Sequence, residues 1–422
     1  MRIGRLIAAT AVALVAAAAA AVAAPTSGGS AASPNWVTAW AASPQIVTTG
    51  GLFSTTPASF DNQTVRNIVF SSVSGSKVRV RFTNGFGTQP LEIGGAAIGV
   101  AGKGAAVSGS DVPLTFGGRP TIKIPVGAEV LSDPVSLKVP ALHDLAVSVY
   151  LPKASGAASG HGDAQQINYV AAGNHAGDPT AGAFTTTAPS WFFVDAVDVV
   201  APARVAGTLV AFGDSITDGF QSTIGANLRW PNDIARRLLA HPGVTLSVAD
   251  EGISGNRVLN SDVCCGINAL ARFDRDALER AGVKAVIVLE AINDIGFSVT
   301  PPLPATAPVT NVSADQLIAG YKQLIAEAHA AGVKIYGGTL TPFRGAAYWS
   351  AAGEVKRETV NSWILHSHAF DGVIDFAQAV ADPLHSQYIR QAYNSGDHLH
   401  PNSAGYHAMA AAVNLAMVLN GL

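Results

Sequence analysis

Residues 209–219 read LVAFGDSITDG, an apolar run that ends in glycine, aspartate and serine. The apolar run has the length of a short buried strand, and the polar residues after it suit a tight turn into a helix. A serine on such a turn, here Ser215, is exposed at the end of the strand, and its backbone N–H points into the same space as the helix start. The same residues also describe an ordinary turn with a helix cap. The surrounding sequence must decide between these two interpretations.

From Gly207 onward, short apolar segments alternate with longer helical patterns. We expect strands at Leu209–Phe212, Val244–Ala249, Ala285–Leu289, Lys334–Gly337 and Val373–Asp375. We expect helices near Asn232–Ala240, Leu270–Ala281, Ala314–Ala331, Gly353–His368 and Ser403–Leu419, with Pro231 in a first turn and Ser313 as a cap. This alternation predicts an α/β domain over residues 204–422, in which helices cover both faces of a parallel sheet. Ligands bind beyond the carboxyl ends of the strands in such sheets.

The preceding part of the chain, residues 35–203, has a different periodicity. Short stretches of alternating apolar and polar residues are separated by glycine, proline and serine, as at Val65–Phe70, Lys77–Phe82 and Leu145–Tyr150. Each stretch is typical of a strand that is buried on one face. Long helical patterns are absent here, so we expect an antiparallel β-sandwich that serves as an accessory domain.

The first residues have the order of a secretory leader. Arg2 and Arg5 precede an alanine-rich apolar run, which ends in small residues at 21–23. This order predicts a signal peptide over residues 1–23, followed by a flexible tether over residues 24–34. An N-terminal membrane anchor is the alternative interpretation. We expect a secreted, extracellular protein without stable membrane anchoring after the leader is cleaved.

The composition limits the range of partners. The 422 residues exceed what one hydrophobic core usually holds. Charged residues make up only 13% of the chain, the net charge is −3, and no basic run is present that would bind phosphates. Nucleic acid is therefore not an expected partner.

Two further residues follow predicted strands of the parallel sheet. Gly255 follows the second strand, where it could present a backbone N–H to a reacting oxygen or simply permit a positive φ. Asn293 follows the third strand, where its amide could donate to a developing oxyanion or form a turn through its own side chain.

The segment before the final predicted helix, residues 395–402, reads SGDHLHPN. A hydroxyl becomes a good nucleophile when a neutral imidazole takes its proton, and a carboxylate fixes the tautomer of that imidazole. Asp397 and His400 can both reach the crevice beside Ser215 from this one loop. The alternative is a metal site that uses Asp397, His398 and His400, but no other acidic or histidine cluster supplies further ligands. We expect His398 to be a packing or surface residue.

Ser215, Gly255, Asn293 and His400 occur in the order of the four sequence blocks of the SGNH hydrolases, and Asp397 matches the acid three residues before the histidine. The chain from about residue 205 to 422 resembles this superfamily. The resemblance implies a flavodoxin-like fold and a serine esterase with a Ser215, Asp397 and His400 triad. The oxyanion hole would be formed by the N–H groups of Ser215 and Gly255 and by the Asn293 side chain. This chemistry requires neither a metal nor an organic cofactor.

One position departs from the family pattern. The third block usually begins with glycine, and this chain has Ala291 there. If the backbone needs a positive φ at this position, alanine would be strained and could turn Asn293 slightly.

Residues 209–219, 271–276 and 395–401 further resemble the xylan-esterase-like branch, which implies short acyl groups on polysaccharides or other small esters as substrates. A lipase or lysophospholipase acting on lipid esters is the nearest alternative. A carbohydrate-binding protein with a degenerate hydrolase fold is another alternative, in which Trp36, Trp40 and Trp191 would line a sugar surface. Scattered tryptophans more often belong to the core.

Asp214, Asp218 and Arg257 are expected to order the loops and take no catalytic step.

The two cysteines of the chain are neighbours, Cys264 and Cys265. A disulfide between adjacent residues is strained, although an oxidising compartment permits it and it would stiffen the loop. Two free thiols are the alternative.

Overall fold

A computed structural model describes residues 34–49, 54, 56–298 and 310–420. The predicted leader at residues 1–23 and the tether up to residue 33 lie outside this part of the chain. Residues 35–422 form one compact unit, with one large hydrophobic cluster mainly in the first half and another mainly in the second. The predicted domain boundary at residues 203–204 stays a prediction.

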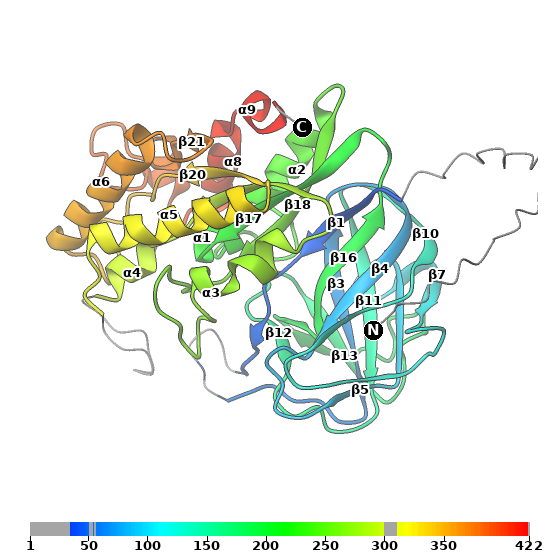
Figure 1. The fold of residues 1–422 in the computed structure, drawn as a ribbon. Helices are drawn as coiled ribbons and strands as arrows, with labels where there is room; N and C mark the ends of the chain where they lie inside the picture. The colour runs from blue at the N-terminus through cyan, green and yellow to red at the C-terminus, as the bar shows by residue number, and fades with distance from the viewer. Residues whose placement is uncertain (1–33, 50–53, 55, 299–309, 421–422) are drawn as a thin grey trace, which may run out of the picture. The chain divides into compact units, whose positions relative to one another are not determined.

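The second half contains the predicted parallel sheet (Figure 1). Its five strands lie in the order β18-β17-β19-β20-β21, which is the 2-1-3-4-5 order of a flavodoxin-like sheet. The strands are β17 (Val205–Gly213), β18 (Thr245–Gly252), β19 (Val283–Leu289), β20 (Lys334–Gly338) and β21 (Gly372–Ile374). All neighbouring pairs are parallel, with Phe212 of β17 opposite both Glu251 of β18 and Val288 of β19. The parallel sheet predicted from the alternating pattern is therefore confirmed.

The helices of this half form two mutually packed groups, one made of α2, α7 and α8 and the other of α3, α5, α6 and α4. Their bounds are α1 (Ser215–Asp218), α2 (Trp230–Ala240), α3 (Ala269–Phe273), α4 (Ile292–Gly296), α5 (Ala314–Ala330), α6 (Ala351–His366), α7 (Phe376–Val380), α8 (Ser403–Ala412) and α9 (Leu415–Leu419). A 3-10 helix covers Gln391–Tyr393. The sequence-predicted cap Ser313 forms a capping box with Gln316, and Pro231 lies in the first turn of α2.

Two predicted helices differ from the structure. The helix expected at Leu270–Ala281 is α3 followed by a π-helix at Asp274–Leu278. The helix expected at Ser403–Leu419 is interrupted, because Val413 is extended and the Asn414 side chain accepts the N–H groups that start α9. An asparagine at this position competes for backbone hydrogen bonds and begins a new helix.

The first half is built from antiparallel strands. One sheet contains β1 (Trp36–Ala41), β16 (Val194–Val200), β4 (Gly75–Thr83), β10 (Val135–Val139) and, beside β4, β9 (Glu129–Leu131). A six-stranded sheet contains, in spatial order, β14 (Thr186–Ala188), β13 (Asn168–Ala172), β3 (Gln63–Ser71), β11 (His143–Leu151), β6 (Gly95–Ala101) and β7 (Val107–Leu114). Smaller sheets pair β12 (Ser159–His161) with β15 (Trp191–Phe192) and β2 (Gln45–Ile46), and β5 (Leu91–Ile93) with β8 (Ile122–Ile124). The two large sheets share one hydrophobic cluster. The antiparallel sheets are therefore as expected, and the sandwich arrangement stays a prediction.

Hydrogen bonds join the two halves. The backbone N–H of Thr38 in β1 lies within hydrogen-bond distance of Ala281 O and of the Thr208 hydroxyl in β17. The backbone N–H of Val248 in β18 donates to the hydroxyl of Ser72. None of the helices in the described part of the chain is both long and apolar enough to cross a membrane.

Candidate active site

Ser215 lies where the first predicted strand of the parallel sheet ends. β17 stops at Gly213, and Asp214 caps the short helix α1 by accepting the N–H of Ile216 at 2.9 Å. Ser215 is the first residue of α1. Its backbone N–H is therefore one of the N-terminal N–H groups that have no hydrogen-bond partner within the helix. Burial raises the pKa of Asp214 to about 7, the Ile216 N–H opposes this shift, and the nearby Asp294 charge adds to it.

The structure brings Ser215, His400 and Asp397 together. Ser215 Oγ lies 2.8 Å from His400 Nε2, and His400 Nδ1 lies 2.6 Å from Asp397 Oδ2. The His400 ring also packs edge to face against Phe220, with 4.7 Å between the ring centroids. Ser215 and His400 are buried, with 4% and 8% of their surfaces exposed. A hydroxyl, an imidazole and a carboxylate in this sequence of contacts can transfer a proton away from the hydroxyl.

The loop that carries Asp397 and His400 is held by its own hydrogen bonds. Asp397 Oδ1 accepts the backbone N–H groups of Leu399 and His400 and the hydroxyl of Ser395 at 2.8–3.0 Å. Burial acts to raise the pKa of Asp397, but the hydrogen bond from the His400 ring and the charge of that ring outweigh burial and hold this pKa well below its usual range. Asp397 is thus kept ionised beside the imidazole.

His398 forms no side-chain hydrogen bond with the group formed by Ser215, His400 and Asp397. Its side chain is exposed, and its Nδ1 lies 2.9 Å from the Asn394 amide. Within the described ranges, the one group of potential metal ligands within 4.8 Å of one another is Asp262, Cys264 and Cys265 rather than the predicted alternative with His398. Both cysteine sulfurs of that group are joined in a disulfide, so they are not thiolate ligands.

Gly255 lies on the loop after β18 with a φ of 80°. A side chain at this position would place its Cβ 2.6 Å from Cys265 Sγ. Glycine is therefore required for both the backbone conformation and the close approach of the cysteine loop.

Asn293 lies in the first turn of α4, after β19, and both ends of its amide are fixed. Its Nδ2 donates to Asn256 O at 2.9 Å, and its Oδ1 accepts the Tyr348 hydroxyl at 3.2 Å. An amide nitrogen carries two hydrogens, so one remains for a further acceptor. Ala291, two residues earlier, has a φ of 101° and is fully buried. The strain expected for alanine in this block is thus present in the backbone.

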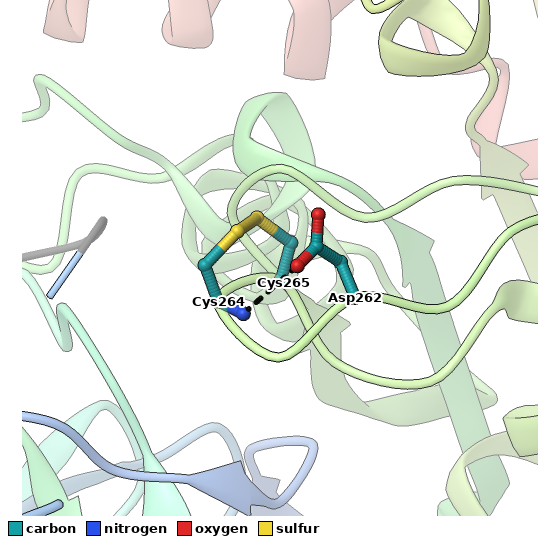
Figure 2. A group of neighbouring side chains, drawn as sticks. All are labelled: Asp262, Cys264 and Cys265. Atoms are coloured by element: carbon teal, nitrogen blue, oxygen red, sulfur yellow. Dashed lines mark hydrogen bonds between the residues drawn. A yellow bond between two sulfur atoms is a disulfide. The ribbon is translucent and has the colours of Figure 1, made fainter. Parts of the chain in front are cut away.

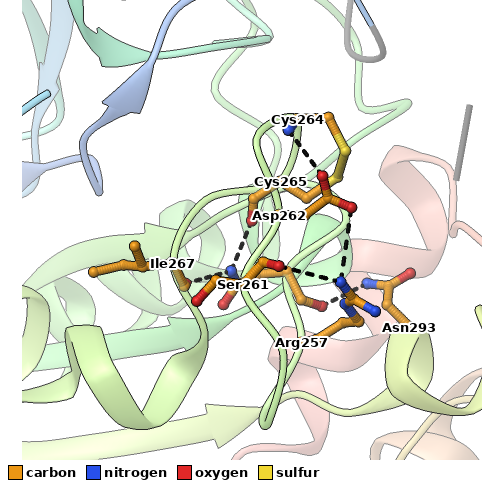
Figure 3. The surroundings of a disulfide bond; sticks show 8 residues. Arg257, Ser261, Asp262, Cys264, Cys265, Ile267 and Asn293 are labelled. Carbon is orange, nitrogen blue, oxygen red and sulfur yellow. Dashed lines mark hydrogen bonds and ion pairs between the residues drawn. A yellow bond between two sulfur atoms is a disulfide. The ribbon is translucent and has the colours of Figure 1, made fainter. Parts of the chain in front are cut away.

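Cys264 and Cys265 form a disulfide, which resolves the two alternatives left by the sequence. Figure 2 shows Asp262 beside this bond, where its carboxylate accepts the N–H of Cys264. The Asn256 side chain donates to Cys265 O at 2.7 Å and to Ile267 O at 2.8 Å. Figure 3 shows Asn293 of α4 beside the disulfide loop, where its amide donates to Asn256 O. The disulfide loop is therefore connected to both candidate oxyanion positions.

Arg272 is a fully buried residue of the stretch 271–276, and the sequence pattern of that stretch predicts no role for it. Its guanidinium donates to Gly213 O and Glu251 O at 2.8 Å, to Asn256 Oδ1 at 2.9 Å and to the Ser43 hydroxyl at 3.0 Å. These acceptors lie at the ends of β17 and β18, on the Gly255 loop and in the first half of the chain. One side chain thus fixes the backbone at the ends of β17, which leads to Ser215, and of β18 beside it.

His161, from β12 in the first half, is a second residue that the sequence analysis missed. Its Nε2 lies 3.0 Å from Asp218 Oδ1 and its Nδ1 lies 2.9 Å from Ser43 O. Asp218 Oδ2 accepts the Ser254 hydroxyl at 2.8 Å, next to Gly255. Burial acts to lower the pKa of His161, but the charge and hydrogen bond of Asp218 raise it above its usual value. Both ring nitrogens face acceptors, an arrangement that favours the charged imidazole and holds Asp218 in place.

The other residues that the sequence singled out, Arg257 and three tryptophans, make ion-pair and ring contacts. Arg257 is buried and pairs with Asp262, with 3.7 Å between the charged atoms. Trp40 and Trp191 are buried with 5.1 Å between their ring centroids, whereas Trp36 is partly exposed beneath Arg79. Trp40 and Trp191 are thus core residues and do not form a sugar-binding surface.

The grouped serine, histidine and aspartate at the end of the parallel sheet have the arrangement that nucleophilic hydrolysis uses. Residues 211–408 match the model of the GDSL-like Lipase/Acylhydrolase family. This part of the chain is therefore a GDSL-like lipase/acylhydrolase domain, which supports a carboxylic ester hydrolase. The family resemblance recognised from the sequence is therefore confirmed.

Three solved structures illustrate the similarity. An acetylxylan esterase from Geobacillus stearothermophilus is 20% identical, with 49% of this chain and 92% of that chain covered and a TM-score of 0.37. A GDSL-like lipase from Bacteroides thetaiotaomicron is 17% identical, with coverages of 50% and 87% and a TM-score of 0.35. An alpha/beta hydrolase from the metagenome of Lake Arreo, Spain, is 20% identical, with coverages of 51% and 96% and a TM-score of 0.39. No curated protein sequence matches the chain.

Proposed function

We propose that the chain is a secreted serine esterase that hydrolyses carboxylic esters through an acyl-enzyme. The observation that carries this proposal is the continuous contact from Ser215 Oγ through the His400 ring to Asp397. His400 Nε2 takes the proton of the hydroxyl as Ser215 attacks the ester carbonyl, while Asp397 fixes the tautomer and stabilises the charged ring.

The ester is then hydrolysed in two steps, formation of the acyl-enzyme and its reaction with water. The C–O bond to the alcohol breaks, His400 gives its proton to the leaving alcohol, and the acyl group stays on Ser215. His400 next takes a proton from water, whose oxygen attacks the acyl carbonyl. The bond between the acyl carbon and Ser215 Oγ then breaks, Oγ regains its proton from His400, and the acid is released. In both steps the N–H groups of Ser215 and Gly255 and the free amide hydrogen of Asn293 stabilise the oxyanion.

Short acyl groups on polysaccharides or other small esters are the proposed substrates. The resemblance of residues 209–219, 271–276 and 395–401 to the xylan-esterase-like branch supports this choice. Secretion is supported by the residue order of positions 1–23 and by the disulfide, since disulfides persist in oxidising compartments.

Hydrolysis of p-nitrophenyl acetate tests the proposal. We expect Ser215→Ala and His400→Ala to lose nearly all turnover, and Asp397→Asn to lose about 10⁴-fold in kcat because the ring then has the wrong tautomer. His398→Asn on the same loop is the matched control and should keep the wild-type rate, since asparagine tolerates the φ of 63° at that position. Turnover that survives in Ser215→Ala would refute the proposed nucleophile.

A further inference from the structure

A cavity of about 350 Å³ lies mainly within the first half of the described chain. Its size is that of a small-molecule site. Apolar side chains form much of its lining, namely Ala58, Phe60, Val170 and Phe192, and Phe60 and Phe192 meet edge to face with 4.7 Å between their centroids. We propose that this cavity binds an apolar group of the ester whose carbonyl is attacked by Ser215. The inference rests on the proposed esterase function and adds the place and chemistry of substrate recognition.

One connection between the cavity and the candidate active site runs through β12. His161 at the end of this strand is hydrogen-bonded to Asp218, which ends the helix that begins with Ser215. The next two residues, Gly162 and Asp163, line the cavity. Burial and the Asp218 charge raise the pKa of Asp163 to about 6.

A second connection runs through the disulfide. Cys264 lines the cavity, while the sulfur of Cys265 lies against Gly255 and its carbonyl accepts from Asn256. The disulfide therefore joins a residue that lines the cavity to one that contacts the candidate oxyanion loop. A substrate group that fills the cavity from the active-site side would lie beside this bond.

The lining indicates the class of ligand. Among the described residues that line the cavity, Asp163 is the only charged one, and neither lysine nor arginine is present. A phosphate headgroup would lack a cation there. Polar groups such as Gln45, Thr49 and Gln63 supply hydrogen-bonding atoms beside the apolar residues. This combination suits a neutral ester with an aliphatic or aromatic group, on either its acyl or its alcohol side.

The test compares two series of neutral esters with the full chain. In the first series, p-nitrophenyl esters run from acetate to octanoate; in the second, acetate esters run from methanol to benzyl alcohol and longer alcohols. Thr187→Trp and Ser59→Trp each place a large ring in the cavity from an exposed lining position, so neither requires a change in the core. Ser136→Trp, exposed on β10 and absent from the cavity lining, is the matched control.

We expect wild-type kcat/KM to rise with the size of the apolar group in one series. The series that shows this rise identifies whether the acyl or the alcohol part of the ester occupies the cavity. The ratio of kcat/KM for the large ester to that for the small one should fall about tenfold or more in Thr187→Trp and Ser59→Trp, and stay unchanged in Ser136→Trp. An unchanged ratio in both cavity variants, or a wild-type rate that falls with size in both series, would overturn the assignment. Hydrolysis that persists in Ser215→Ala would instead refute the esterase mechanism, so the two failures are distinguishable.

Discussion

The two halves of the chain contribute different kinds of residues to the candidate site. The proposed reacting groups, Ser215, Asn293 and His400, all come from the half that contains the parallel sheet. The first half contributes Ser43 and His161, which are buried and contact Arg272 and Asp218 behind the reacting groups. The antiparallel half is thus part of the support of the site as well as a neighbour in sequence. Substitutions in the two halves should therefore have different signatures.

The largest effect on stability is expected from the first half. His161→Ala should lower the free energy of unfolding by about 3–5 kcal/mol, because Asp218 would remain buried without its charged partner. Chemical denaturation would measure this loss. His161→Gln, which can still donate to Asp218, should recover part of it, and the exposed His143→Ala is the control. A His161→Ala protein as stable as wild type would show that the halves are not coupled at this contact.

The largest effect on turnover without loss of the triad is expected at Asn293. Asn293→Ala should lower kcat about 100–1,000-fold, because one oxyanion donor is lost. Tyr348→Phe removes only the hydroxyl that orients this amide, so it should reduce kcat much less. Steady-state kinetics with an activated acetyl ester would measure both. Near-wild-type turnover in Asn293→Ala would remove this residue from the oxyanion hole.

A smaller effect, on stability, is expected from replacing Ala291, whose backbone is strained, in the same half of the chain. Ala291→Gly should stabilise the fold by up to about 1 kcal/mol, because glycine adopts a φ of 101° without steric cost. Thermal denaturation would detect the change. Ala285→Gly in β19 is a matched control that should destabilise, since it creates a gap in the core without relieving strain. A destabilised Ala291→Gly protein would contradict the interpretation of this position as strained.

The smallest effect is a change in the pH dependence of stability. Asp214 has a folded-state pKa of about 7, above its unfolded value near 3.8, so the folded state binds the additional proton between these values. Its contribution to stability is present at low pH and is lost as the pH rises through this window. Asp214→Asn should therefore lose less stability between pH 5 and pH 7.5 than wild type, whereas the exposed Asp61→Asn should follow wild type. An equal slope in Asp214→Asn and wild type would contradict the raised pKa.

Local patterns in the sequence predicted much of the hydrolase half. The parallel strands follow from short apolar runs, and the ends of those runs indicate Ser215, Gly255 and Asn293, because a strand end and its turn are encoded within a few adjacent residues. The interruption at Val413–Asn414 was missed, since an apolar helical pattern continues through a capping asparagine.

The supporting residues could not be predicted in the same way. His161 and Asp218 are 57 positions apart, and Ser43 and Arg272 are 229 positions apart. Each contact forms because a buried charge needs a partner. That charge becomes buried only when the two halves pack together. Arg272 carried a local signal within the quoted stretch 271–276, but nothing in that stretch shows that its side chain is buried. The vicinal disulfide likewise remained open, because neighbouring cysteines are compatible with either redox state.

Labelling with a fluorophosphonate, followed by peptide mass spectrometry, tests the central claim most directly. The proposed proton transfer from Ser215 to His400 predicts a single covalent adduct on Ser215, fast labelling of the wild-type protein, much slower labelling of His400→Ala and none of Ser215→Ala. An adduct on another residue, or equal labelling rates in wild type and His400→Ala, would contradict it.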